Sequence, residues 1–168
     1  MKSFDTIKIR RFHLSDLTSV IAILQNAFPD AHEFSGLTSS NIKRILYLQF
    51  KYGKLSVIMR SLKFLFANTY DQAVFIAEEG SKNMVVGVAI VSPITRDVWS
   101  LGQIAVLPGH CGKSIGSQLM KKVISHVRSK EGEKIQLYVR TNNASAIKLY
   151  TKLGFAIADQ LNLMTIDL

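Results

Sequence analysis

The apolar residues of this chain recur in two rhythms, one typical of strands and one typical of helices. Short apolar or alternating runs predict β-strands over residues 7–10, 73–78, 84–91, 98–106, 134–139, 155–158 and 163–167. Only the polar turn 79–83 separates the second run from the third, which predicts an antiparallel hairpin.

Segments in which apolar residues recur every three or four positions predict helices over residues 16–28, 39–68, 114–130 and 143–153. Ser15 is the expected N-cap of the first helix, Gly53 breaks the second into two, and Gly154 closes the last. Strands and helices do not alternate regularly, so we expect an α/β fold in which a mixed sheet carries helices on both faces. The 168 residues, 48% of them hydrophobic, contain no repeat or linker, and we expect one domain.

The charge balance favours an anionic partner. Lys and Arg number 21 against 12 Asp and Glu, and the net charge of +9 has the sign that suits a polyanionic cofactor or nucleic acid. The single cysteine, Cys111, excludes an internal disulfide and a cysteine-rich metal site, so we expect no metal and a reducing compartment. The start of the chain does not resemble a signal peptide, and no apolar run reaches the roughly 18 residues that span a bilayer. We therefore expect a cytoplasmic protein with no membrane partner.

The stretch from Gln103 to Met120 has the features of an anion site. An apolar strand leads through a glycine-bearing turn into a helix, so unpaired backbone N–H groups and the positive end of the helix dipole meet at one point. The run G-K-S at residues 112–114 is also the tail of a P-loop, but Leu107 stands where the first P-loop glycine belongs. Read alone, the stretch fits the phosphates of CoA and those of a nucleotide nearly equally, and a P-loop nucleotide hydrolase stays a remote alternative for the whole chain.

Two motifs resemble the GNAT superfamily of acetyl-CoA-dependent N-acetyltransferases. The family's phosphate-binding pattern Q/R-x-x-G-x-G/A falls on residues 111–116, with Cys111 in place of Gln or Arg and Ser114 in place of the first Gly. The second pattern, V-x-x-x-N-x-x-A-x-x-L-Y-x-x-x-G-F, is matched at Val139, Asn143, Ala146, Leu149, Tyr150, Gly154 and Phe155. The two occur in the family's order. The resemblance implies a GNAT-like acyltransferase fold, with a mostly antiparallel sheet that splays between its fourth and fifth strands.

The resemblance also implies the site residues. Those implied for the cofactor are Ile104, Ala105, Val106, Cys111, Gly112, Lys113, Ser114, Ile115, Gly116, Asn143 and Tyr150. The N–H of Ile104 is the implied oxyanion donor, and Tyr150 is the implied general acid that protonates the CoA thiolate. From the residues alone, Ser114 and Asn143 serve equally as helix caps, and Tyr150 also fits an apolar helix face.

The implied reaction is direct attack of a primary amine on acetyl-CoA in a ternary complex, with a small molecule or a protein amine as acceptor and nucleic acid disfavoured. The alternative is a GNAT-like module that binds acyl-CoA with weak activity or none. Ser100 stands where family members often carry a glutamate base, and no replacement is singled out among Asp30, Glu33, Glu78, His13, His32 and His110. A homodimer and the role of the basic helical segment 39–68 stay open.

Overall fold

A computed structural model describes residues 6–29, 72–80 and 82–159 of the chain. These residues fall into two units, within Met1–Leu137 and Tyr138–Leu168, and each unit is described by itself. The predicted helical segment 39–68 and the predicted strand 163–167 lie outside the described residues. The expectation of one domain over the whole chain stays a prediction.

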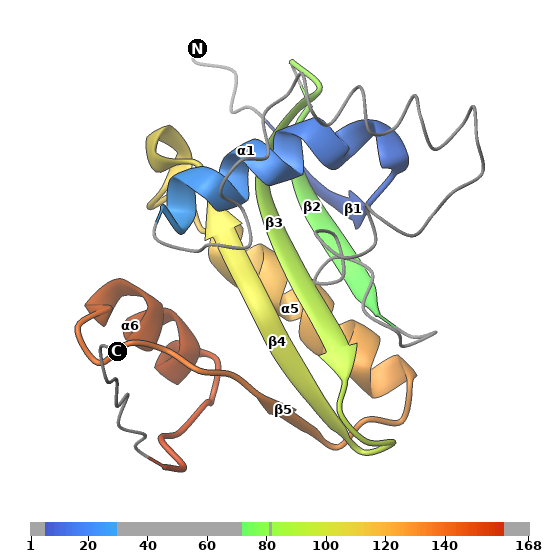
Figure 1. Ribbon diagram of the computed structural model, residues 1–168, viewed down its shortest axis with the longest axis vertical. Helices are drawn as coiled ribbons and strands as arrows, with labels where there is room; N and C mark the ends of the chain where they lie inside the picture. Colours follow the sequence, from blue (N-terminus) through green and yellow to red (C-terminus); the bar gives the residue numbers. More distant parts are fainter. Residues whose placement is uncertain (1–5, 30–71, 81, 160–168) are drawn as a thin grey trace, which may run out of the picture. The chain divides into compact units, whose positions relative to one another are not determined.

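The first unit contains a five-stranded mixed sheet (Figure 1). Its strands are β1 (Ile7–Arg11), β2 (Ala73–Glu79), β3 (Met84–Pro93), β4 (Val98–Val106) and β5 (Lys134–Gln136), and they lie in sequence order across the sheet. The strands β1 to β4 pair antiparallel, whereas β5 runs parallel to β4. This confirms the predicted mixed and mostly antiparallel sheet, including the hairpin of β2 and β3.

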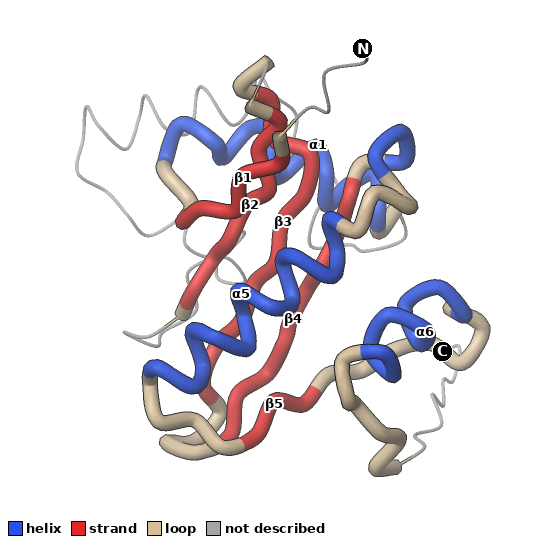
Figure 2. The backbone as a smooth tube through the Cα atoms, turned by 180° about the vertical axis from the view of Figure 1, so that it is seen from behind, coloured by secondary structure: helices blue, strands red, loops and turns tan. Residues whose placement is uncertain are grey.

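One helix covers each face of this sheet. The one-turn helix η1 (Leu14–Asp16) leads into α1 (Leu17–Ala27) on one face, and α5 (Ile115–Ser129) crosses the other, as Figure 2 shows from behind. The core beneath α1 comprises Leu17, Val20, Ile21, Ile23, Leu24, Ile76, Val85, Val88, Ile90 and Ala105. On the opposite face, a side chain at Gly87 would lie 3.2 Å from Leu119, so this glycine lets α5 pack close to β3.

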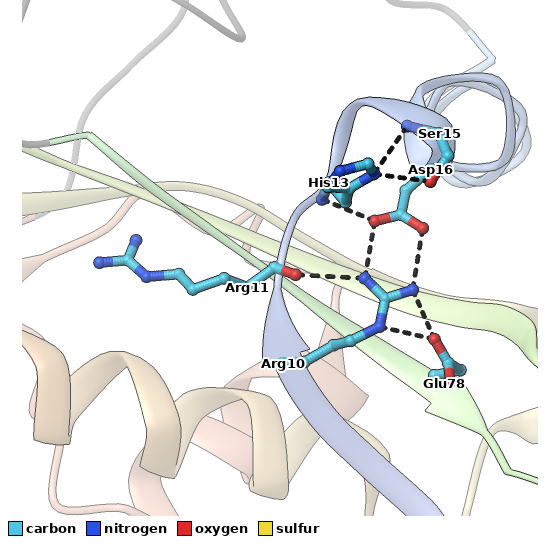
Figure 3. A network of polar contacts seen from close by, with 6 residues as sticks. All are labelled: Arg10, Arg11, His13, Ser15, Asp16 and Glu78. Atoms are coloured by element: carbon cyan, nitrogen blue, oxygen red, sulfur yellow. Dashed lines mark hydrogen bonds and ion pairs between the residues drawn. The ribbon is translucent and has the colours of Figure 1, made fainter.

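A polar network fixes the start of α1 against the sheet (Figure 3). The guanidinium of Arg10 donates two hydrogen bonds to the Asp16 carboxylate, at 2.8 and 2.9 Å, and a third to Glu78 at 2.6 Å. Burial alone would raise the pKa of the Asp16 carboxyl, but hydrogen bonds from Arg10 and from the His13 backbone N–H hold it below its usual value. The prediction that Ser15 caps the helix is wrong, because the His13 side chain caps the extra turn η1 and accepts from the Ser15 N–H.

Two predicted strands end differently in the structure. The strand predicted to reach Val139 stops at Gln136, where its pairing with β4 also ends, and Tyr138 is 77% exposed. Alternating side chains alone do not extend a strand when no neighbouring strand continues the ladder. Residues 155–158 form no strand either, because Phe155 takes part in closing helix α6 (Ala144–Lys152) of the second unit.

Candidate functional site

The edge of β4 that faces β5 is open over the second half of the strand. The pairing with β5 covers only Val98–Ser100, and among the described residues Leu101–Val106 has no ladder partner on that side. The pairing with β3 shifts register between Ile90 and Val91, which leaves Gly102 as an extra residue of β4. Such a bulge bends its strand. The sheet therefore splays between its fourth and fifth strands, as the resemblance implied.

The direction of the backbone groups along this edge follows from the ladder. The N–H of Leu107 donates to the Val86 carbonyl on β3 at 2.9 Å, and backbone directions alternate along a strand. The N–H and C=O groups of Ile104 and Val106 consequently point away from β3, toward the open edge. Ala105 turns its backbone to β3 and buries its side chain in the core beneath α1. The open edge thus offers hydrogen bonds to an extended ligand from alternate residues.

The loop between β4 and α5 gathers unpaired N–H groups. After the short helix η3 (Pro108–His110), the backbone is left-handed at Gly112 (φ 79°) and at Ser114 (φ 59°). The first hydrogen bond of the helix is that of Gln118 to the Ser114 carbonyl, and among the described residues no partner exists for the N–H groups of residues 112–117. Residues 115–117 form the first turn of α5, and free N–H groups at the positive end of a helix bind anions. We call residues 112–117 the cradle.

Ser114 occupies the N-cap of α5 without capping it. Its side chain makes no cap hydrogen bond, so the interpretation of its hydroxyl as a cap is wrong. A left-handed backbone costs a residue with a Cβ about 1 kcal/mol more than glycine. The glycine of the family pattern at this position therefore has a conformational reason, and this chain adopts the same conformation with serine at that cost.

The side chain of Cys111 forms hydrogen bonds with the start of the loop and the end of β4. Its thiol donates to the carbonyls of Leu107 (3.5 Å) and Val106 (3.9 Å), and its N–H donates to Pro108 at 3.2 Å. The side chain is thus engaged with the end of β4, whereas the backbone N–H groups that follow it form the cradle.

A buried carboxylate contacts His110 of this loop. Glu79, the last residue of β2, is 3% exposed, and its Oε1 lies 3.3 Å from Nε2 of His110. Lys82 approaches the second carboxylate oxygen at 3.5 Å. Glu79 has no distinguishing feature in the sequence, since Glu78 precedes it with the same side chain. Adjacent residues of a strand face opposite sides of the sheet, so Glu79 is buried beside His110 whereas Glu78 joins the network around Arg10.

The three described candidates for a general base are already engaged. Glu78 and His13 belong to the network around Arg10 (Figure 3), and His110 pairs with Glu79. The candidates Asp30, His32 and Glu33 lie outside the described residues. Ser100 lies on β4 as expected and pairs with Ser92 and Gln136.

The second unit is organised around helix α6. The side chain of Asn143 accepts from the Ala146 N–H at 3.1 Å, which confirms Asn143 as a helix cap. At the other end, Gly154 (φ 91°) donates to Thr151, and Phe155 donates to the carbonyl of Tyr150. This is a Schellman motif, and its usual apolar contact is made by the rings of Tyr150 and Phe155, whose centroids are 5.8 Å apart.

Tyr150 is buried, with 8% of its surface exposed. Burial raises the pKa of its phenol above the ordinary value, so the group keeps its proton at neutral pH. Among the described residues its hydroxyl has no hydrogen-bond partner. Of the expected site residues, the structure brings Ile104, Val106 and residues 111–116 into one continuous strand, loop and helix start, whereas Asn143 and Tyr150 belong to the second unit.

Two features are absent from the described residues. None of their helices is long and apolar enough to cross a membrane. No group of three or more His, Cys, Asp or Glu side chains in the described part of the chain is arranged to hold a metal ion.

Comparisons with known proteins give a consistent result. The sequence model of the acetyltransferase (GNAT) family matches residues 41–155, whereas no curated protein gives a significant match. An acetyltransferase from Trypanosoma brucei has a TM-score of 0.63 at 20% identity, over 97% of this chain and 100% of that one. AAC(6')-Iy in complex with the bisubstrate analog CoA-S-monomethyl-acetylneamine has a TM-score of 0.67 at 16% identity, over 97% and 99%. Glucosamine-6-phosphate N-acetyltransferase from Arabidopsis thaliana has a TM-score of 0.64 at 18% identity, over 96% and 99%. Identities this low demonstrate a shared fold alone.

Proposed function

The chain belongs to the GNAT acetyltransferase family, and on that premise we propose that it transfers an acetyl group from acetyl-CoA to a primary amine. The observation that carries the proposal is the continuity of the open β4 edge with the cradle. Acetyl-CoA is an extended chain with a thioester at one end and a pyrophosphate further along. An edge of alternating N–H and C=O groups followed by an anion-binding helix start offers complementary partners in that order.

In this proposal the backbone of β4 holds the pantetheine arm and the reacting carbonyl. Ile104 and Val106 are the residues whose backbone groups point to the open edge, and we confine the pantetheine contacts to them. The Ile104 N–H donates to the oxyanion that develops when the amine attacks the thioester. Loss of such a donor costs about 2.7 to 4 kcal/mol of transition-state stabilisation where it has been measured.

The pyrophosphate is assigned to the cradle, where backbone N–H groups rather than side chains supply the hydrogen bonds. This explains how the site tolerates Cys111 and Ser114 at positions where the family pattern has other residues. Lys113 is exposed beside the N–H groups and adds a positive charge.

Tyr150 is proposed as the general acid. The amine forms a bond to the acetyl carbon, the C–S bond breaks, and the phenol gives its proton to the departing thiolate. Two features support this role: the raised pKa keeps the phenol protonated, and no described residue occupies its hydroxyl. Because the described candidates for a base are engaged elsewhere, we propose that water molecules take the proton from the substrate ammonium, so that the neutral amine can attack.

The names of the structural neighbours support an amine acceptor. One is a glucosamine-6-phosphate N-acetyltransferase, and two others are aminoglycoside acetyltransferases from soil metagenomic samples. The shared chemistry is acetylation of a primary amine, and we propose a small-molecule or protein amine for this chain. Cytoplasmic location and homodimer formation remain predictions.

A binding module without turnover is the second candidate, favoured by Ser100, which stands where a glutamate base is often found. The test is to incubate the purified chain with acetyl-CoA and a panel of primary amines, with the acetylated amine detected by mass spectrometry. That readout avoids thiol reagents, which would also react with the exposed Cys111. Formation of acetylated amine supports the enzyme; tight binding of acetyl-CoA without any product supports the module. A preference for ATP-Mg over acetyl-CoA in a thermal-shift assay would overturn both.

A further inference from the structure

The contact between Glu79 and His110 joins two parts of the first unit that are distant in sequence. Glu79 is held by strands on both sides, opposite Ile7 of β1 and opposite Met84 of β3. His110 is the last residue of η3, directly before Cys111 and Gly112. The contact therefore ties the loop to a strand that is paired on both sides.

The His110 ring depends on Glu79 for its orientation. Its Nε2 lies 3.3 Å from the Glu79 carboxylate, whereas its Nδ1 is buried and has no hydrogen-bond partner among the described residues. Glu79 is thus the only side chain among the described residues that hydrogen-bonds this ring. Its own carboxylate needs the imidazole in return, because a buried charge is destabilising unless it is paired. Lys82, which is 65% exposed and makes no hydrogen bond to Oε2, contributes less.

We propose that Glu79 and His110 form a positioning pair that sets the loop, and with it the cradle, for the pyrophosphate of acetyl-CoA. The inference rests on the proposed function. The loop beyond His110 contains Ser114, whose left-handed backbone is strained for a residue with a Cβ and persists only where its surroundings hold it. The pair anchors one end of this segment, and α5 anchors the other.

The test compares two ligands that differ in the pyrophosphate. Acetyl-CoA contacts both the cradle and the β4 edge, whereas S-acetylpantetheine carries the same thioester and lacks the pyrophosphate. Glu79→Leu should weaken acetyl-CoA binding by about tenfold and change S-acetylpantetheine binding by less than about twofold. Glu79→Gln still accepts a hydrogen bond from the imidazole and should recover most of the affinity. A purely structural role would lower the affinity for both ligands together.

Two further variants keep the inference testable if Glu79→Leu does not fold. His110→Phe removes the contact from the loop side and should also weaken acetyl-CoA selectively, whereas His110→Gln, whose amide can donate to Glu79, should weaken it less. Glu78→Gln is the matched control, since it removes the same charge one residue away, on the opposite face of β2. It should leave the ratio of the two affinities unchanged.

The outcomes separate the two proposals. A wild-type chain that binds no acetyl-CoA overturns the proposed function and this inference with it. A wild-type chain that binds acetyl-CoA, together with Glu79→Leu and His110→Phe variants of unchanged affinity or with equal losses for both ligands, overturns the positioning pair alone.

Discussion

The two helices that follow the two family motifs begin in opposite ways. Helix α6 begins with Asn143, whose side chain occupies the Ala146 N–H at 3.1 Å. Helix α5 begins with Ser114, whose side chain makes no cap and whose backbone is left-handed. One helix start satisfies one of its N–H groups with a side chain, whereas the other has no side-chain cap and adopts a backbone that carries a conformational cost.

This difference explains why the better-matched motif and the better-formed site are not the same segment. The second motif matches the family pattern at seven positions. Several of these residues have a role in folding: Asn143 caps α6, Gly154 has a left-handed backbone, and the rings of Tyr150 and Phe155 are in contact. The first motif departs from its pattern, yet its backbone has the geometry of an anion site. A site made of backbone groups tolerates changed side chains, whereas the catalytic role proposed for the second unit depends on the hydroxyl of Tyr150.

The largest expected effect comes from closing the cradle. Gly112→Glu strains the backbone, because a residue with a side chain rarely adopts φ 79°. It also places a negative charge next to the N–H groups proposed to bind the pyrophosphate. Acetyl-CoA affinity measured by calorimetry should fall by about 100-fold or more. Gly109→Glu makes the same change of charge in the same loop, at a glycine with open space around it and no left-handed backbone. It should fold normally and lose much less affinity; equal losses would show that charge alone, not the backbone of the cradle, governs binding.

The second prediction tests whether the second unit takes part in catalysis as well as in folding. Tyr150→Phe removes the hydroxyl and keeps the ring that contacts Phe155. With the best acceptor of the amine panel, kcat should fall by about 100-fold, with little change in the affinity for acetyl-CoA. Tyr138→Phe, in the same unit and exposed, is the matched control and should leave kcat unchanged. An unchanged kcat in Tyr150→Phe would assign this residue to the Schellman motif alone.

The parts of the fold that the sequence predicts well are those that one element determines by itself. The strands β1 to β4 and helix α5 lie close to their predicted bounds, because each has an apolar stripe that faces the core of one unit. The end of β5 was not predictable in this way. Its alternation continues to Val139, but the parallel ladder with β4 stops at Gln136.

The candidate site also has parts that the sequence predicts and parts that it does not. A strand, a glycine-bearing turn and a helix are readable in sequence, so the cradle was predictable from the residues, whereas the open edge at Ile104 was implied by the family resemblance. The pair of Glu79 and His110 was not predictable, because it joins residues 31 positions apart and neither residue has a signature in the sequence. The capping role of His13 was missed for a related reason, since the extra turn η1 has no periodic signature of its own.

A smaller effect tests the cap of α6. Asn143→Ala leaves the Ala146 N–H without its acceptor and should lower the free energy of unfolding by about 1 kcal/mol, measured by chemical denaturation. Ser114→Ala, the same kind of truncation at the start of α5, removes no cap and should change it by much less. Asn143→Ser keeps a capping oxygen with a shorter reach. If that variant retains stability and binds acetyl-CoA more weakly, Asn143 also contacts the cofactor, as the family resemblance implied.

The smallest effect concerns the strain at Ser114. Ser114→Gly removes the conflict between Cβ and the left-handed backbone and should raise the free energy of unfolding by about 1 kcal/mol or slightly less, since glycine also gains freedom in the unfolded chain. Ser117→Gly, three residues further along and inside α5, should instead lower it by about 0.5 kcal/mol. Thermal and chemical denaturation of the two variants measure these opposite signs. Two losses of equal size would mean that the start of α5 is not held left-handed without a ligand, and the contrast with α6 would then arise only on binding.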